Sequence, residues 1–348
     1  MLVERIEGKW IDAFVQTFEL CGVSEGDVCA VLSETQSRRV NVELSELALQ
    51  RLGARVFHVT IPTLPQSAPV AIRSTGASDV IDGLEPVVAA LAGVTLIADC
   101  TVEGLLHAKE LPALLGSGAR ALMVSNEHPE ILERLVPDPA LEAKVRTGTK
   151  MLKAANEMRV TSAAGTDLVI DVEKAPAGSS WGYTSRPGTI AHWPGGLCLC
   201  FPPEGSVNGT LVLDVGDVNL TFKRYVDSAI RCTIEDDFIV DIAGEGVDAA
   251  LMKSYFAAWG DKEAYAVSHV GWGMNPGARW DSMAMYDKSQ TNGTELRAFG
   301  GNFLYSTGAN EVAGRHTLGH FDLPMAGCTI SLDGTDVVTA GVLQGELA

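Results

Sequence analysis

Three residues in the second half of the chain could together hold a metal ion. His320 and Asp322 are separated by one residue, so on an extended segment both side chains point to the same face. A third candidate ligand, His269, lies upstream in a glycine-rich segment. Two histidines and one carboxylate, with other coordination positions open, are the ligand set of non-haem Fe(II) oxygenases. We therefore hypothesise that these residues bind one metal; the alternative is that they are ordinary buried polar residues of a β-rich core.

The first 150 residues are expected to form a scaffold of alternating strands and helices. Short apolar runs alternate with segments whose apolar residues recur at helical spacing. The expected strands are 28–32, 56–60, 94–98 and 120–124, and the expected helices are 4–20, 39–52, 80–91, 103–115 and about 128–135. This alternation predicts an open, largely parallel α/β sheet. The first strand-to-helix turn, at 33–37, contains no glycine, so nucleotide binding is not expected.

A β-rich second half is expected to follow a long helix at about 139–157. Asp333-Gly334, between alternating apolar segments, is a hairpin signal. The other expected elements are a hairpin over 160–172, strands at 210–218, 230–234, 238–242, 296–306 and 320–341, and a helix near 246–259. We predict an α/β domain over 1–150 and a β-rich, barrel-like, metal-binding catalytic domain over 151–348.

Composition excludes several classes of partner. At 348 residues the chain exceeds the usual size of one hydrophobic core, which favours two domains. The formal charge of −18 would repel nucleic acid and anionic lipid, and no stretch approaches 18 uninterrupted apolar residues, so neither nucleic acid nor membrane is an expected partner. Seven cysteines without a C-x-x-C pair, and no secretory segment at the start, indicate reduced thiols and a cytoplasmic location.

An ordered set of short segments resembles the 2,5-dihydroxypyridine 5,6-dioxygenases, Fe(II) enzymes of bacterial nicotinate and pyridine breakdown. No single segment is specific for this family, but the occurrence of all of them in the same order over nearly the whole chain is specific. The segments are Leu105-Leu106-His107, His192-Trp193-Pro194, 209–217, Ser268-His269-Val270-Gly271-Trp272-Gly273, Arg297-Ala298-Phe299, Gly301-Asn302-Phe303-Leu304, Ser306-Thr307-Gly308 and His320-Phe321-Asp322.

The wider relatives that the chain resembles are the aminopeptidase T-like metallopeptidases, which share the two-domain fold and need two metal ions. Their pattern has glutamates where this chain has Leu197 and Ala264. His269, His320 and Asp322 suffice for one metal, but the two-metal scheme for activating water is then unavailable. A two-metal aminopeptidase is therefore the second hypothesis, and a non-catalytic binding protein on the same fold is the third.

The resemblance implies a ring-cleaving dioxygenase of the extradiol type. Its Fe(II) would be held by a facial triad of His269, His320 and Asp322. The expected substrates are O2 and 2,5-dihydroxypyridine, or a close hydroxypyridine, opened between carbons 5 and 6 to give N-formylmaleamate. The resemblance also suggests a homo-oligomer.

The resemblance also gives roles to four further residues. His192 is the expected acid/base catalyst, since an imidazole titrates near neutral pH, although it could instead be a structural histidine. Arg297 could donate to the ring's 2-oxygen or form a strand-end salt bridge, and Ser306 is a possible donor to the substrate. His107 would reach over the site from a loop. The dioxygenases have a glutamate about where Ser180 stands, so a different hydroxypyridine is expected if that glutamate assists the substrate.

Overall fold

Four strands of the first part of the chain and one strand from the second part form a five-stranded parallel sheet. The computed structural model describes residues 5–65 and 78–348. The strand order is β2-β1-β3-β4-β8, with every pairing parallel. The strands are β1 (Val28–Glu34), β2 (Arg55–Ile61), β3 (Leu96–Asp99), β4 (Arg120–Val124) and β8 (Ile190–Trp193). The expected α/β region with an open, largely parallel sheet is confirmed.

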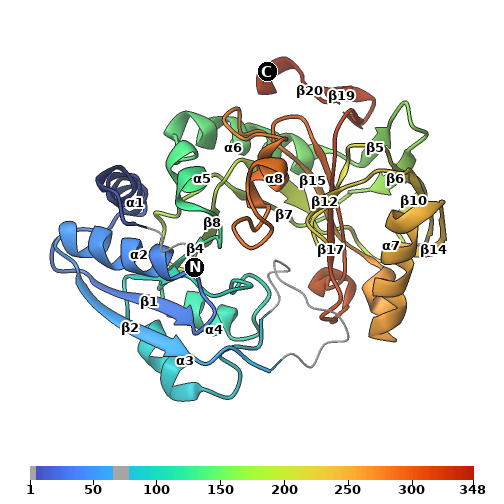
Figure 1. The fold of residues 1–348 in the computed structure, drawn as a ribbon. Coiled ribbons are helices and arrows are strands. Elements are labelled where there is room, and N and C mark those ends of the chain that lie inside the picture. Colours follow the sequence, from blue (N-terminus) through green and yellow to red (C-terminus); the bar gives the residue numbers. More distant parts are fainter. Residues whose placement is uncertain (1–4, 66–77) are drawn as a thin grey trace.

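Helices cover both faces of this sheet because its central strands are apolar on both sides. Along β1, Cys29 and Val31 pack in one apolar cluster while Ala30 and Leu32 pack in another. The helices are α1 (Gly8–Leu20), α2 (Arg39–Arg51), α3 (Glu85–Ala92), α4 (Leu111–Gly116) and α5 (Pro129–Arg134). Figure 1 shows α1 and α2 on one side of β1 and β2, and α3 and α4 on the other.

The helix expected over 103–115 is wrong in its first half, since α4 begins only at Leu111. The segment before it is held in turns by buried carboxylates. Asp99 accepts from the backbone N–H of Thr101 at 3.0 Å and of Leu105 at 2.8 Å, and Glu34 accepts from Val102 N–H at 2.6 Å. These side-chain bonds stabilise a series of turns over 101–105, so the chain there does not take up helical conformation. The helix expected over 80–91 likewise begins only at Glu85.

The second part of the chain contains two antiparallel sheets. The larger has the order β14-β13-β10-β6-β5-β18-β19-β20, and the smaller has the order β17-β16-β15-β9-β7. The strands of the larger sheet are β5 (Glu157–Thr161), β6 (Asp167–Asp171), β10 (Val207–Leu213), β13 (Ile230–Glu235), β14 (Phe238–Ala243), β18 (Thr329–Leu332), β19 (Thr335–Thr339) and β20 (Val342–Leu343). Those of the smaller sheet are β7 (Ala177–Ser180), β9 (Leu197–Cys200), β15 (Val267–Gly273), β16 (Phe303–Thr307) and β17 (Phe321–Met325). A short ribbon of β11 (Val218–Asn219) and β12 (Arg224–Tyr225) lies beside β17.

The β-rich expectation and the hairpin at Asp333-Gly334 are confirmed. Within the described residues the two sheets do not close into a barrel. The division at residue 150 stays a prediction. The helix over Pro139–Ala154 spans this position, and β8, from the second half of the chain, pairs with β4 of the first sheet.

The second part of the chain also contains helices and 3-10 turns. They are α6 (Pro139–Ala154), α7 (Gly246–Trp259), α8 (Ser282–Met285) and α9 (Thr294–Ala298), with 3-10 turns η1 (Lys262–Tyr265), η2 (Glu311–Ala313) and η3 (Gly345–Leu347). The strand expected over 296–306 is wrong at its start, because α9 lies there and its first N–H, that of Thr294, donates to buried Glu127 at 2.8 Å. Across the described ranges, we find no helix with the length and apolar character that crossing a membrane requires.

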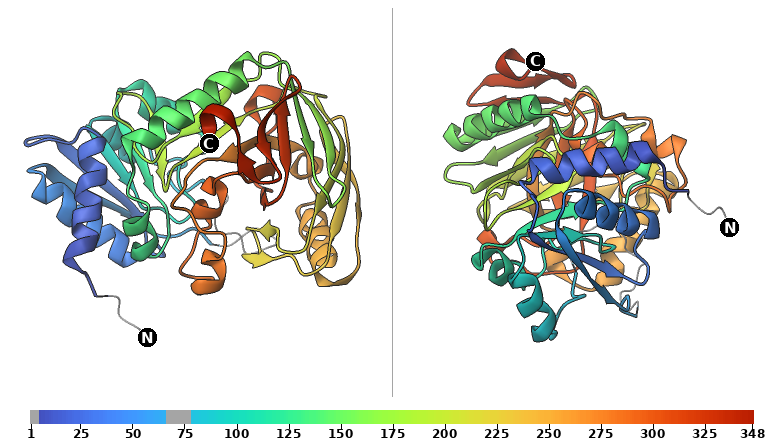
Figure 2. Two further views of the ribbon diagram at one scale, coloured as in Figure 1. Left: turned by 90° about the horizontal axis from the view of Figure 1, so that it is seen from above. Right: turned by 90° about the vertical axis from the view of Figure 1, so that its left-hand side faces the viewer.

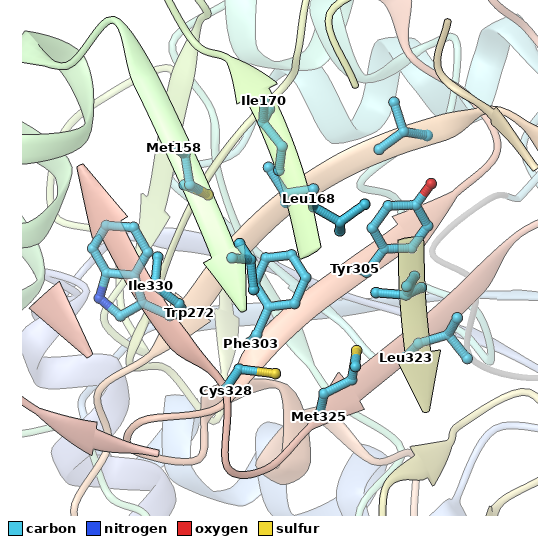
Figure 3. Close-up of a cluster of buried hydrophobic side chains, with 14 of the residues drawn as sticks. Met158, Leu168, Ile170, Trp272, Phe303, Tyr305, Leu323, Met325, Cys328 and Ile330 are labelled. Atoms are coloured by element: carbon cyan, nitrogen blue, oxygen red, sulfur yellow. The ribbon is translucent and has the colours of Figure 1, made fainter. Parts of the chain in front are cut away.

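An apolar core lies between the two antiparallel sheets (Figure 3). Trp272 of β15, Phe303 and Tyr305 of β16, and Leu323 of β17 all point into it. Because side chains alternate along a strand, the residues between these positions face the opposite side of the smaller sheet. Figure 2 shows that this opposite side is turned toward the parallel-sheet region. The core therefore fixes which side chains of β15, β16 and β17 can form a site.

Candidate metal centre

Three buried donor groups converge at the ends of two strands of the smaller sheet. His269 lies on β15, Asp322 on β17, and His320 immediately before β17. One donor atom from each lies within 4.8 Å of the others, and the three residues are 5–6% exposed. The structure thus brings together the three ligands that the sequence predicts.

A neighbouring hydroxyl orients the ring of His269. Ser268 Oγ lies 3.1 Å from His269 Nδ1 and donates its proton to the carbonyl of Ala309 at 2.5 Å. A hydroxyl has one proton, so it can only accept from the imidazole, and Nδ1 carries the ring proton. Burial lowers the pKa of His269 to about 3, so the ring is neutral and its Nε2 presents a lone pair.

That lone pair faces a carboxylate, and this arrangement favours a cation. His269 Nε2 is 3.7 Å from Asp322 Oδ1, beyond hydrogen-bond distance. Neither atom can donate to the other, so two acceptors face each other in a buried site. His320 Nε2 is 3.2 Å from the same oxygen. Two imidazole nitrogens and a carboxylate oxygen suit a divalent transition metal such as iron, so the residues fit the ion that the resemblance implies.

Two donors hold the carboxylate of Asp322 in place. Arg297 Nε donates to Oδ2 at 2.6 Å, and the hydroxyl of Ser306 donates to Oδ1. Burial by itself would raise the pKa of Asp322, but Arg297, His320 and His269 outweigh it and hold that pKa well below its usual range. The carboxylate is therefore ionised and oriented as a ligand must be.

The backbone of His320 is fixed by groups that sequence reasoning missed. The hydroxyl of Tyr255, on α7, accepts from His320 N–H at 2.8 Å and donates to the His320 carbonyl at 2.6 Å. The Thr221 hydroxyl donates to the same carbonyl at 3.2 Å. Tyr255 is 65 residues away in the chain, and neither its residue type nor its helical position indicates this contact.

His192 reaches the centre from the parallel sheet. Its Nδ1 lies 2.7 Å from the carbonyl of Pro194, which can only accept, so Nδ1 carries the proton and Nε2 has the lone pair. Burial lowers the pKa of His192 to about 4. Ser180 Oγ accepts from His192 N–H at 3.2 Å and donates to its carbonyl at 3.1 Å. The ring is therefore neutral at pH 7, and its position is set by β7.

His107 lies on the turn segment that Asp99 stabilises. Its ring centroid is 5.9 Å from that of His320, and burial lowers its pKa to about 4. The loop that was expected to reach the centre does so, although it is a series of turns and not the start of a helix.

One small cavity, of about 80 Å³, joins these groups. Its lining includes all three metal-ligand candidates together with His107, His192 and Arg297. Residues of the lining that were not foreseen include Glu103, Met123, Ser125, Leu199, Asn292 and Thr294. Ser306 is fully buried and its hydroxyl is committed to Asp322, so the structure favours positioning of the ligand over contact with a substrate. Leu197, where the metallopeptidase pattern has a glutamate, lines the cavity, and Ala264 is fully buried.

Comparison with known proteins gives a consistent set of relatives. The family model described as 2,5-dihydroxypyridine 5,6-dioxygenase matches residues 9–345. A curated protein of that name from Pseudomonas putida KT2440 is 37% identical over 332 residues, covering 94% of each chain. The solved structure of 2,5-dihydroxypyridine dioxygenase from that strain has a TM-score of 0.91 at 35% identity, covering 97% of this chain and 98% of the other. Wild-type AmpT from Thermus thermophilus, at 13% identity and a TM-score of 0.67, covers 97% of this chain and 99% of its own, and shares the fold.

Proposed function

The chain belongs to the 2,5-dihydroxypyridine 5,6-dioxygenase family, and we propose that it is an Fe(II)-dependent enzyme that opens a hydroxypyridine ring. The substrate would be 2,5-dihydroxypyridine or a close analogue, cleaved between carbons 5 and 6. Both atoms of one O2 would enter the product, N-formylmaleamate. The observation that carries this proposal is the buried His-His-Asp donor set beside the neutral base His192 in one small cavity.

His269, His320 and Asp322 would hold the iron. When bound, Fe(II) would supply the one-electron chemistry that lets triplet O2 react with a closed-shell ring. Zinc could bind the same ligands but has no redox chemistry to offer. Ser268 and Ser306 would keep two of the ligands in orientation, His269 and Asp322, through the bonds described above.

His192 would act as the base that removes a proton from a ring hydroxyl. Its lone pair is on Nε2, and its low pKa keeps it unprotonated at neutral pH. Removing the proton makes the ring more electron-rich, which favours its oxidation. The Pro194 carbonyl would stabilise the imidazolium that forms, because it accepts the Nδ1 proton at 2.7 Å.

Arg297 would have two roles, one toward Asp322 and one toward the substrate. Its Nε is committed to Asp322, while the guanidinium also lines the cavity and has further N–H groups. Those groups could donate to the ring's 2-oxygen and stabilise negative charge that develops there. His107, neutral and opposite His320, would contact the ring from the turn segment.

The walls of the cavity would keep water from the reacting atoms. Leu106, Met123, Leu197 and Leu199 give it an apolar side, and its small volume suits a single ring better than a peptide. Leu197 and Ala264 also leave this chain without the carboxylates expected of a two-metal peptidase, so we rank that function second.

Isotope labelling distinguishes these functions. Turnover under 18O2 should place two labelled oxygen atoms in the ring-opened product, whereas a hydrolase would take oxygen from water. His320→Ala and Asp322→Ala should each abolish iron retention. Hydrolysis of leucine p-nitroanilide by protein carrying two divalent ions would instead establish the peptidase.

Two further features stay predictions. All seven cysteines are free and buried, which suits a reducing compartment such as the cytoplasm. A homo-oligomer is expected from the family resemblance, and sedimentation velocity would test it.

A further inference from the structure

A second, larger cavity of about 720 Å³ adjoins the metal centre. It shares His192, Leu106, Met123, Leu197 and Leu199 with the small cavity, so the two are contiguous at these side chains. Its volume lies in the range of ordinary small-molecule sites. It therefore offers a compound one route between solvent and His192. We call it the vestibule.

The vestibule differs in charge from the rest of the protein. Arg146, Lys150 and Lys153 line it from one face of α6, at the i, i+4, i+7 spacing of a helix, and Arg186 lines it from the segment after β7. Among the described residues that line it there is no aspartate or glutamate. The whole chain has 44 acidic residues against 26 basic ones, whereas only Arg146 of the four cations around the vestibule is paired with an acid, so the sign of the charge is locally reversed.

Three of these cations are available to a ligand. Arg146 is paired with Glu142 at 2.5 Å and lies over the ring of Trp181 at 4.3 Å. Within the described chain, no ion pair within 4.0 Å involves Lys150, Lys153 or Arg186, and all three are exposed. Like charges gathered without counter-charges raise the local positive potential and attract anions into the opening.

The part of the vestibule that adjoins the small cavity is apolar. Leu197, Leu199, Met123 and Phe201 form its wall next to His192. A ligand that suits both the apolar wall and the cations has a small apolar body and one anionic group, with the anion directed toward the cations of α6. A simple carboxylate meets this description, because lysine ammonium groups bind it as point charges without fixed geometry.

We propose that the vestibule is a binding site for small organic carboxylates that enter or leave the metal centre. Two sources share this chemistry: a ring substrate that carries a carboxylate substituent, and the ring-opened product. The second source rests on the proposed function, since cleavage of a neutral dihydroxypyridine creates a carboxylic acid that ionises at neutral pH. Binding itself can be measured without turnover.

The test is a titration of the metal-free and the iron-loaded protein, under argon, with matched acids and amides. Benzoate against benzamide represents a ring carboxylate, and maleamate against maleamide represents the product. Trp181 lies in the vestibule wall and gives a fluorescence readout, with calorimetry as the second measurement. The variant is Lys150→Gln/Lys153→Gln/Arg186→Gln, and the control is Lys144→Gln, which removes a cation from α6 outside the vestibule.

Each acid should bind more tightly than its amide, and the triple variant should weaken acid binding by about five- to tenfold while leaving amide binding unchanged. Raising the salt from about 50 to 300 mM should weaken acid binding to wild type, since these charges are exposed. Preference for benzoate alone identifies a ring carboxylate, and preference for maleamate alone identifies the product. Equal binding of acids and amides, or wild-type acid binding by the triple variant, would overturn the proposal. Loss of dioxygenase activity would not affect this binding result.

Discussion

Replacing Ser268 by alanine tests how much the orientation of His269, a proposed metal ligand, contributes to metal binding while His269 itself is kept. The hydroxyl is fully buried and makes two hydrogen bonds, one from His269 Nδ1 at 3.1 Å and one to the Ala309 carbonyl at 2.5 Å. Without it, the ring proton has no acceptor there, and the neutral ring can rotate or change tautomer. Either change turns the Nε2 lone pair away from the metal position.

The expected loss is in metal affinity. Removal of a group that orients a metal-bound histidine costs about 10- to 100-fold in affinity, or about 1.4 to 2.7 kcal/mol. The lost hydrogen bonds should also destabilise the metal-free fold by about 1 kcal/mol. The assay is an anaerobic competition titration of Fe(II) against a coloured chelator, with urea unfolding of the metal-free protein alongside.

The matched control is Ser45→Ala. Ser45 is also fully buried, and its hydroxyl donates to the Asn41 carbonyl at 2.8 Å, within α2. It should lose a similar amount of stability and no iron affinity. Unchanged Fe(II) affinity in Ser268→Ala, or an equal loss in Ser45→Ala, would refute the orientation argument.

Three further predictions concern the cavity. Arg297→Gln leaves the buried Asp322 carboxylate without its cation, so we expect a loss of about 3 kcal/mol in the urea unfolding free energy of the metal-free protein; a loss below 1 kcal/mol would contradict the buried pair. His192→Gln should lower kcat/KM by about 100-fold while Fe(II) affinity stays at the wild-type value, and full activity would exclude the base role. Because burial lowers the pKa of His192 to about 4, the neutral form persists as pH falls, and the acidic limb of kcat/KM should lie below about pH 5; a midpoint near 6.5, the ordinary imidazole value, would show that His192 is not the base or is not buried.

Two of the three candidate metal ligands could be predicted to lie together because their geometry is local. The one-residue spacing of His320 and Asp322 on an extended segment predicts that both side chains lie on one face. Asp322 is on β17 and His320 immediately before it, and their donor atoms lie within 4.8 Å of each other. The third ligand came from residue type and resemblance, and the pairing of β15 with β16, and of β16 with β17, brings it to the same face.

The supporting contacts could not be predicted, because each joins distant parts of the chain. Ser268 bonds to a carbonyl 41 residues later, and Tyr255 clamps a residue 65 positions away. No periodicity encodes such pairs. The first half of the expected helix over 103–115 failed for a similar reason: Glu34, 68 residues before Val102, accepts the Val102 N–H and helps to hold the chain in turns. Tertiary hydrogen bonds there override local helical propensity.

The vestibule could be predicted only in part from the sequence. The spacing of Arg146, Lys150 and Lys153 on a helix face is readable from the sequence, but a cationic face is usually only a solvated surface. The cationic face of α6 becomes a candidate binding surface because α6 packs on β7 and β9, next to the strand that carries His192. Only the fold places that face at the opening to the metal centre.

The central claim, a single catalytic iron in the His-His-Asp site, is tested most directly by anaerobic reconstitution. Metal-free protein is loaded with Fe(II), desalted, analysed for bound metal, and mixed with 2,5-dihydroxypyridine in an oxygen-electrode cell. We predict about one iron per chain, lost in Asp322→Ala, and consumption of one O2 for each ring opened. Two bound ions, or iron binding that survives Asp322→Ala, would contradict the site, and an absence of O2 uptake by the iron-loaded protein would contradict the reaction.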